Sequence, residues 1–163
     1  MNIKRKKHRP PLRGKKCSKL SKTDAAYIAG IIDGEGCVTL SKKKDPSMRL
    51  GYGLRPHITV VNTNKKLIQF LKDITNLGVV YSGQDKKKNS KPHFRWQLWS
   101  QQARSFLLEI LPYLVLKQKQ AQLVLDYTER CAAYVGGPLP KSALLYQERA
   151  CTKMRKLNKR GIN

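Results

Sequence analysis

Two carboxylates separated by one glycine, Asp33 and Glu35, stand out in a chain of 163 residues with only 10 Asp and Glu. They close a segment, residues 27–36, whose apolar residues recur at helical spacing and which stops at glycines. Carboxylates at a helix C-terminus are disfavoured because the helix dipole is negative there. Two acids at such a point therefore indicate that a cation binds beside them.

The helix that carries these acids is expected to begin behind Thr23, with Asp24 in its first turn. Its isoleucines share a bulky face that can enter a core. A second face has little side-chain bulk and would let another helix backbone approach closely. This small face is formed by Ala26, Ala29, Gly30 and Asp33.

Residues 27–36, YIAGIIDGEG, resemble the signature decapeptide of the LAGLIDADG homing endonucleases, with Glu35 in the place of its final acid. Residues 112–121, PYLVLKQKQA, resemble a second recurrent block of the single-motif, homodimeric branch of that family. The first lysine of this block, here Lys117, is a basic residue of the family's active-site pocket. The resemblance covers roughly residues 23–132 and implies an αββαββα fold.

A formal net charge of +24, from 34 Lys and Arg, makes nucleic acid the first partner to consider. Charge alone indicates only a polyanion, since ribosomal proteins and histones are equally basic. Residues 1–22 contain ten Lys or Arg and no acid, and we interpret them as a basic N-terminal arm. A solubilising tail, a phosphate-binding extension and a transit peptide all fit this composition.

The four cysteines are far apart and lack zinc-finger spacing, so we expect no structural zinc. Reduced thiols and the lack of a secretory pattern predict an intracellular protein, either organellar (chloroplast or mitochondrion) or in a bacterial cytoplasm. The most apolar run, residues 106–116, is short and is interrupted by Glu109 and Pro112. We therefore expect no membrane span and no membrane partner.

Alternating residues predict strands over residues 37–41, 55–61, 79–82 and 93–99. Helical spacing predicts helices over residues 63–76, 101–111, 117–131 and 141–157 in addition to the first. This order predicts an α+β fold with a four-stranded antiparallel sheet and helices on one of its faces. We divide the chain into the basic arm (1–22), a core domain (23–135) and a C-terminal helix with a basic tail of the same domain (136–163).

Outward polar side chains and three-lysine runs in both predicted hairpin turns describe a positive sheet face that could lie in a major groove. There Arg can pair with guanine and Gln with adenine, while lysines hold phosphates. The residues assigned to DNA binding are Ser41, Lys43, Arg55, His57, Thr59, Tyr81, Lys86, Lys88, His93, Arg95 and Gln97. A lysine run can also be plain solvated surface, and Tyr81 can belong to the sheet's hydrophobic edge.

The resemblance implies roles for individual residues. Glu35 would be the metal-binding carboxylate, with the Gly34 carbonyl as a further ligand, and Lys117 would activate the base or stabilise charge. Asn62 would position a water and Lys66 would add a positive charge; a turn-forming Asn and a solvated Lys are the alternatives. Asp33 is favoured as a brace of helix ends over a metal ligand.

One motif supplies one metal-binding carboxylate, so the resemblance implies that two chains pair to cut both DNA strands. The dimer interface would be the small face of the first helix, formed by Ala26, Ala29, Gly30 and Asp33. The resemblance implies a Mg²⁺-dependent homodimer, with two or three divalent ions per dimer active site, that makes a staggered cut in a long, pseudo-palindromic duplex. The alternatives are a maturase that binds intron RNA and a non-cleaving DNA-binding protein. Intact Glu35 and Lys117 count against the non-cleaving alternative.

Overall fold

The computed structural model describes residues 15–46, 50–84, 91–132 and 140–159. In chain order the elements are α1 (Lys22–Glu35), β1 (Gly36–Lys44), β2 (Tyr52–Asn62), α2 (Lys65–Thr75), β3 (Val79–Gly83), β4 (His93–Trp99), α3 (Ser100–Ile110), the 3-10 helix η1 (Leu111–Tyr113), α4 (Gln118–Ala132) and α5 (Lys141–Leu157). The predicted α+β fold with an αββαββα core is confirmed.

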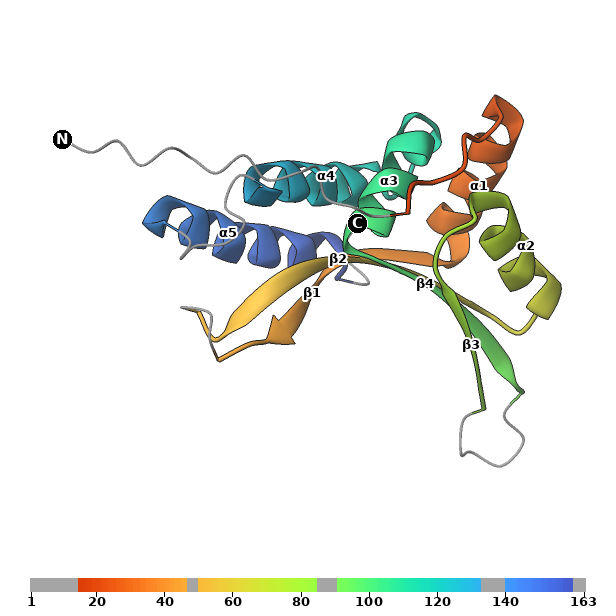
Figure 1. The fold of residues 1–163 in the computed structure, drawn as a ribbon, viewed down its shortest axis with the longest axis horizontal. Coiled ribbons are helices and arrows are strands. Elements are labelled where there is room, and N and C mark those ends of the chain that lie inside the picture. The colour runs from red at the N-terminus through yellow and green to blue at the C-terminus, as the bar shows by residue number, and fades with distance from the viewer. Residues whose placement is uncertain (1–14, 47–49, 85–90, 133–139, 160–163) are drawn as a thin grey trace.

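The four strands form one sheet in the order β1-β2-β4-β3, and each neighbouring pair is antiparallel. The helices lie over one face of this sheet, and the opposite face, here called the open face, is uncovered (Figure 1). The two hairpins curve apart below the helices, so the open face is concave. The antiparallel sheet with helices on one face was predicted, and it leaves one side of every strand for another molecule.

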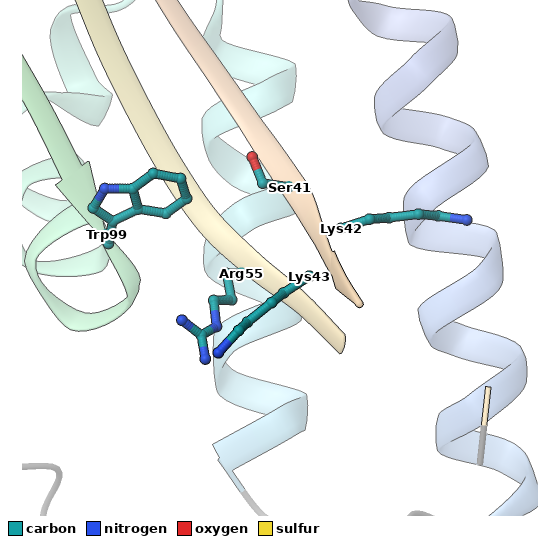
Figure 2. Close-up of a pocket in the computed structure, with 5 residues that line it drawn as sticks. All are labelled: Ser41, Lys42, Lys43, Arg55 and Trp99. Carbon is teal, nitrogen blue, oxygen red and sulfur yellow. The ribbon is translucent and has the colours of Figure 1, made fainter. Parts of the chain in front are cut away.

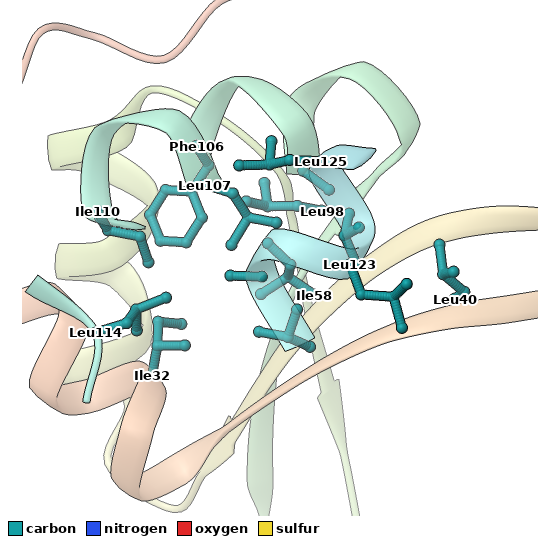
Figure 3. Packing of buried hydrophobic residues seen from close by; sticks show 14 of the residues in the cluster. Ile32, Leu40, Ile58, Leu98, Phe106, Leu107, Ile110, Leu114, Leu123 and Leu125 are labelled. Carbon is teal, nitrogen blue, oxygen red and sulfur yellow. The ribbon is translucent and has the colours of Figure 1, made fainter. Parts of the chain in front are cut away.

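Alternation along the strands separates the core from the open face. Ile58, Val60, Trp96 and Leu98 point toward the helices and are fully buried. Against them pack apolar side chains of the helices (Figure 3), among which Ile32, Phe106, Leu107 and Ile110 are also fully buried. The ring of Trp96 meets Phe106 edge to face, with centroids 5.3 Å apart.

Several predicted boundaries differ from the observed ones; β2, for example, begins at Tyr52 instead of residue 55. The N-cap of α1 is Ser21 instead of Thr23, because the Ser21 hydroxyl accepts the amide of Asp24 at 3.1 Å. The first lysine run belongs to β1 and not to the turn, since Lys42 pairs with Leu54 and Lys44 with Tyr52. As a result, alternate lysines of this run point to opposite sides of the strand.

The segment before α1 packs on the helical layer. The amide of Cys17 donates to the Ser105 hydroxyl at 2.6 Å, and the amide of Ser18 donates to the Thr75 carbonyl at 3.2 Å. Burial, with a smaller effect of nearby Glu109, raises the pKa of the Cys17 thiol to about 11, so this thiol stays protonated. The part of the basic arm that the structure describes is therefore held against α2 and α3.

The C-terminal helix α5 completes the same core. Ala150 and Met154 are buried with the strand residues, and the Gln147 side chain donates to the Tyr52 carbonyl at 3.1 Å. Just beyond the helix, the Asn158 side chain donates to the Val38 carbonyl of the edge strand β1 at 3.1 Å. Among the described residues, no helix is long and apolar enough to cross a lipid bilayer.

Candidate active site and nucleic-acid interface

The C-terminal turn of α1 presents Glu35 to solvent. Glu35 and Gly34 are exposed, and Gly36 ends the helix with its amide bonded to the Ile32 carbonyl. A Cβ on Gly36 would lie 2.7 Å from the Ile32 carbonyl oxygen, so only glycine allows this close turn into β1. In the part of the chain that the structure describes, the Glu35 carboxylate has no hydrogen bond or ion pair.

Asp33 has a different surrounding. Its carboxylate accepts the amides of Val115 at 2.7 Å, Leu116 at 3.1 Å and Lys117 at 2.9 Å. These amides lead into α4, where the helix dipole is positive and favours a carboxylate. The predicted bracing role of Asp33 is confirmed, and its carboxylate is occupied within its own chain.

Lys117 lies at the same end of α1. Its ammonium group donates a hydrogen bond to the main-chain carbonyl of Asp33. The last turn of α1 contains no basic residue of its own, so Lys117 supplies the positive charge that this helix end favours. Glu35 and Lys117, which are 82 positions apart in the sequence, are thus brought to one helix end.

Asn62 and Lys66 lie where the chain passes from β2 into α2. Asn62 is the last residue of β2. It lies two positions beyond Val60, which pairs with Gly36 directly after the end of α1. The Asn62 side chain accepts the amide of Asn64 at 2.8 Å, and Asn64 in turn caps α2. This bond agrees with the turn-forming alternative, while Lys66 is exposed in the first turn of α2.

The donor set at the end of α1 fits a hard cation. The exposed carboxylate of Glu35 and the carbonyl of Gly34, in the last helical turn, both offer the oxygen ligands that Mg²⁺ prefers. Across the described residues, no three His, Cys, Asp or Glu side chains gather as a metal site. Of the two carboxylates near this helix end, that of Asp33 is held by three amides, whereas that of Glu35 is exposed.

The exposed face of α1 differs from the predicted one. Ala29 is fully buried against the core, so its assignment to a dimer interface is wrong; the helix is rotated so that Ile28, Ala29 and Ile32 point inward. Ala26, Gly30 and Gly34 are exposed. A Cβ at Gly30 or Gly34 would meet nothing within 4 Å, so packing within this chain does not require either glycine.

The open face is positive. The four strands contain five Lys or Arg and no acid. Outward positions face each other across the sheet in rows: Ser41 with Arg55, Thr59 with Gln97, and Arg95 with Tyr81. Arg55, Tyr81 and Arg95 are exposed, as predicted. The other described residues assigned to this face are Lys43, His57 and His93, whereas Lys86 and Lys88 lie outside the described residues.

His57 is enclosed more than a phosphate contact would require. Its imidazole stacks on Trp99, with centroids 3.7 Å apart and an interplanar angle of 9°, and its Nδ1 lies 3.3 Å from the Ser41 hydroxyl. Burial, with a smaller effect of Arg95, lowers the His57 pKa to about 4. The ring is therefore neutral at physiological pH, which favours a base edge over a phosphate as its partner.

Trp99 is the residue of this face that the sequence interpretation missed. It continues the outward series of β4 after Arg95 and Gln97, and 40% of its surface is exposed. With Ser41, Lys43 and Arg55 it lines a hollow of about 330 Å³ (Figure 2). Lys42 borders the same hollow but points the other way, toward α5, which places it off the open face.

Residues 28–132 match the family model described as LAGLIDADG endonuclease. No curated protein sequence matches the chain significantly. The solved structure of the homing endonuclease I-CvuI, in complex with a DNA target in the presence of Mg, has a TM-score of 0.70 at 23% identity over 87% of this chain and 85% of that one. At such identities a structural likeness shows the fold alone.

Two further structures have the same fold. The archaeal intron-encoded homing endonuclease I-Vdi141I, complexed with DNA, has a TM-score of 0.69 at 16% identity over 86% of this chain and 87% of that one. The I-LtrWI LAGLIDADG homing endonuclease, bound to target DNA, has a TM-score of 0.61 at 20% identity. That match covers 90% of this chain but only 47% of I-LtrWI, so the present fold corresponds to about half of the longer protein.

Proposed function

Because the chain belongs to the LAGLIDADG endonuclease family, we propose that it is a homodimeric, Mg²⁺-dependent homing endonuclease that makes a staggered double-strand cut in a long, pseudo-palindromic DNA target. The observation that carries this proposal is the end of α1. There an exposed carboxylate, Glu35, has no partner among the described residues, and a lysine from a distant segment is anchored by the carbonyl of Asp33, two residues before Glu35. The Glu35 carboxylate is thus left available to a cation at the end of the helix that carries the family motif.

Glu35 and the Gly34 carbonyl would hold the metal ion. When bound, Mg²⁺ would supply Lewis-acid activation of water and of the scissile phosphate. The role of Lys117 follows from its anchoring: its ammonium group is fixed at the helix end and can stabilise negative charge that develops on the phosphate oxygens. Asn62 would hold an attacking water if its amide nitrogen, which is not needed for the bond to Asn64, faces the site.

The bare face of α1 supports a homodimer. Glycine inside a helix costs about 0.5–1 kcal/mol relative to alanine, and this chain has two such glycines with open space beside them. A second copy of α1 packing closely there would account for both. Next to this helix end, the side chains of Val115 and Leu116 are 80% and 72% exposed, which adds apolar surface to the proposed interface.

The open face supports double-stranded DNA as the substrate. It combines basic, amide and aromatic side chains on a concave sheet that lacks acids within its strands. I-CvuI and I-Vdi141I, which share this fold, were solved with DNA. Duplex DNA on this face would present its base edges to the outward residues of the strands. A two-fold dimer would extend the contact to two half-sites.

The direct test is cleavage of a duplex library of random sequence by the full-length chain, with Mg²⁺ or with EDTA. Wild type should cut one family of related, roughly palindromic sequences and leave matched overhangs. Glu35→Gln should bind the same sequences without cutting them. Glu148→Gln, which removes an exposed acid on α5, is the matched control and should cut normally. Cutting by Glu35→Gln at the wild-type rate would overturn the proposal.

A further inference from the structure

Two polar atoms on the open face are buried without a hydrogen-bond partner in the described part of the chain. They are the His57 Nε2 and the Thr59 Oγ1, on successive outward residues of β2. A buried polar atom without a partner costs free energy, so native proteins almost always pair them. Because both atoms lie on the open face, they indicate that a hydrogen-bonding partner from another molecule is missing in the free protein.

Trp99 covers one member of this pair, His57, in the free protein. It is the last residue of β4 and lies directly opposite His57 in the sheet register. Its indole lies flat on the imidazole, while Thr59 occupies the next outward row. An indole is an unusual cover here, because it places a large apolar ring among Ser41, Arg55 and Lys43 and leaves 40% of its surface exposed to water.

The indole has space to move. The hollow beside it, about 330 Å³, is lined by Trp99 itself together with Ser41, Lys43 and Arg55 (Figure 2). The hollow is open to solvent and far larger than the space that one water needs. The main chain of Trp99 is held by the pairing of β4 and by the start of α3, where Ser100 has a left-handed φ of 50°. Movement is therefore confined to the side chain.

We propose that Trp99 is a movable aromatic cover, and that a base pair in the major groove displaces it so that the His57 Nε2 and the Thr59 Oγ1 hydrogen-bond to the base edge. The inference rests on the proposed function, since it requires duplex DNA on the open face. The displaced indole enters the hollow beside Arg55 and offers an apolar contact to the adjacent base, of the kind that a thymine methyl group accepts.

Neutral His57 suits this role. Ser41 can either donate to the His57 Nδ1 or accept from it, and the choice decides whether the Nε2 is an acceptor or a donor. The trio of Ser41, His57 and Thr59 can therefore adapt to one base-pair edge without any change in charge. The His57 Nε2 and the Thr59 Oγ1 have no hydrogen-bond partner in the described part of the free protein. A base pair that offers them no hydrogen bond leaves both atoms unpaired, so it should bind more weakly than one that does.

The movement is tested by ¹⁹F NMR on full-length protein labelled with 5-fluorotryptophan, which has two signals because the chain has two tryptophans. Trp99→Phe assigns the Trp99 signal, and Trp96, fully buried, is the internal control. The DNA probes are the duplex selected from the random library and a scrambled duplex of equal length. We expect the selected duplex to shift the Trp99 signal and to leave the Trp96 signal in place. An unchanged Trp99 signal in the saturated complex would overturn the inference.

The reading role is tested by the base preference of Thr59→Val, a near-isosteric change that removes only the hydroxyl function. It should lower discrimination at one base-pair position in each half-site by about tenfold, as expected for loss of one specific contact. Thr152→Val, at an exposed position on α5, is the matched control and should leave the preference profile unchanged. An unchanged profile for Thr59→Val, with normal binding and cutting by wild type, would refute this inference alone. Failure of wild type to bind any duplex would refute the proposed function together with it.

Discussion

Replacing Asp33 with alanine separates bracing from metal binding. The carboxylate accepts three main-chain amides, from Val115, Leu116 and Lys117, at 2.7–3.1 Å. Alanine would leave these amides to water and would remove the acid that lies beside the segment leading into α4. The substitution acts on a half-buried group, so each bond contributes less than it would in a core.

The expected loss follows from these hydrogen bonds. A hydrogen bond to a charged group contributes about 1.5–3 kcal/mol, and the three bonds to Asp33 share one half-buried carboxylate, so they are not additive. We therefore expect Asp33→Ala to lower the free energy of unfolding by about 2 kcal/mol. For a chain of this length that corresponds to a fall in melting temperature of about 4–8 °C.

The assay pairs Asp33→Ala with Glu35→Gln. Thermal unfolding followed by circular dichroism should show the loss for Asp33→Ala and almost no change for Glu35→Gln, whose carboxylate is exposed and unpaired among the described residues. Cleavage should show the reverse order: Glu35→Gln is inactive, while Asp33→Ala retains a reduced rate with an unchanged dependence on Mg²⁺ concentration. Asp33→Asn, which keeps one acceptor oxygen, should fall between wild type and Asp33→Ala in stability.

Two results would refute this reasoning. A melting temperature of Asp33→Ala within about 1 °C of wild type would show that the three hydrogen bonds do not brace the helix ends. A large increase in the Mg²⁺ concentration needed for cleavage, without a loss of stability, would show that Asp33 is a metal ligand.

Three further outcomes are expected. Gly30→Leu should stabilise the single chain by up to about 1 kcal/mol, because leucine favours a helix and meets open space, yet should abolish the dimer in sedimentation and abolish cutting. The pKa of His57 is lowered from 6.5 to about 4, so the stability that its neutral ring contributes is present above pH 6.5 and is lost as the pH falls toward 4. The free energy of unfolding of wild type, measured with urea, should fall over that range by no more than about 2 kcal/mol. The free energy of unfolding of His57→Phe should fall by less over the same range. Lys43→Ala should flatten the salt dependence of DNA binding by about one unit of log–log slope per chain, whereas Arg95→Ala should also relax base preference.

The fold could be predicted because its signals are local. Strict alternation over residues 93–99 placed Trp96 and Leu98 in the core and Arg95 outside, and this is where they lie. The first strand was predicted too short, since charged residues at 42–44 resemble a turn. These residues become part of the strand because they pair with β2, and the composition of residues 42–44 alone gives no sign of that pairing.

The candidate site was predicted in part. The positions of Asp33, Glu35 and Lys117 at one helix end followed from the resemblance, but the three amides held by Asp33 join segments more than 80 residues apart and carry no local pattern. The inward rotation of Ala29 was missed because an alanine fits a core as well as an interface. Trp99 was missed because aromatic residues are usually buried. Its position in the alternation of β4, on the same side as Arg95 and Gln97, nevertheless indicates that it points outward.

The contact between Asn158 and the edge strand has a consequence for where this protein can be shortened. The matched family region ends at residue 132, yet the free edge of β1 is protected by a side chain 26 positions later. An unprotected edge strand is a template for pairing with other chains. A protein ended at residue 132 would also uncover the apolar side chains that now pack on Ala150 and Met154. We therefore expect a chain ended at residue 132 to associate with itself more readily than the full chain, because α5 and Asn158 cover this edge and this apolar surface.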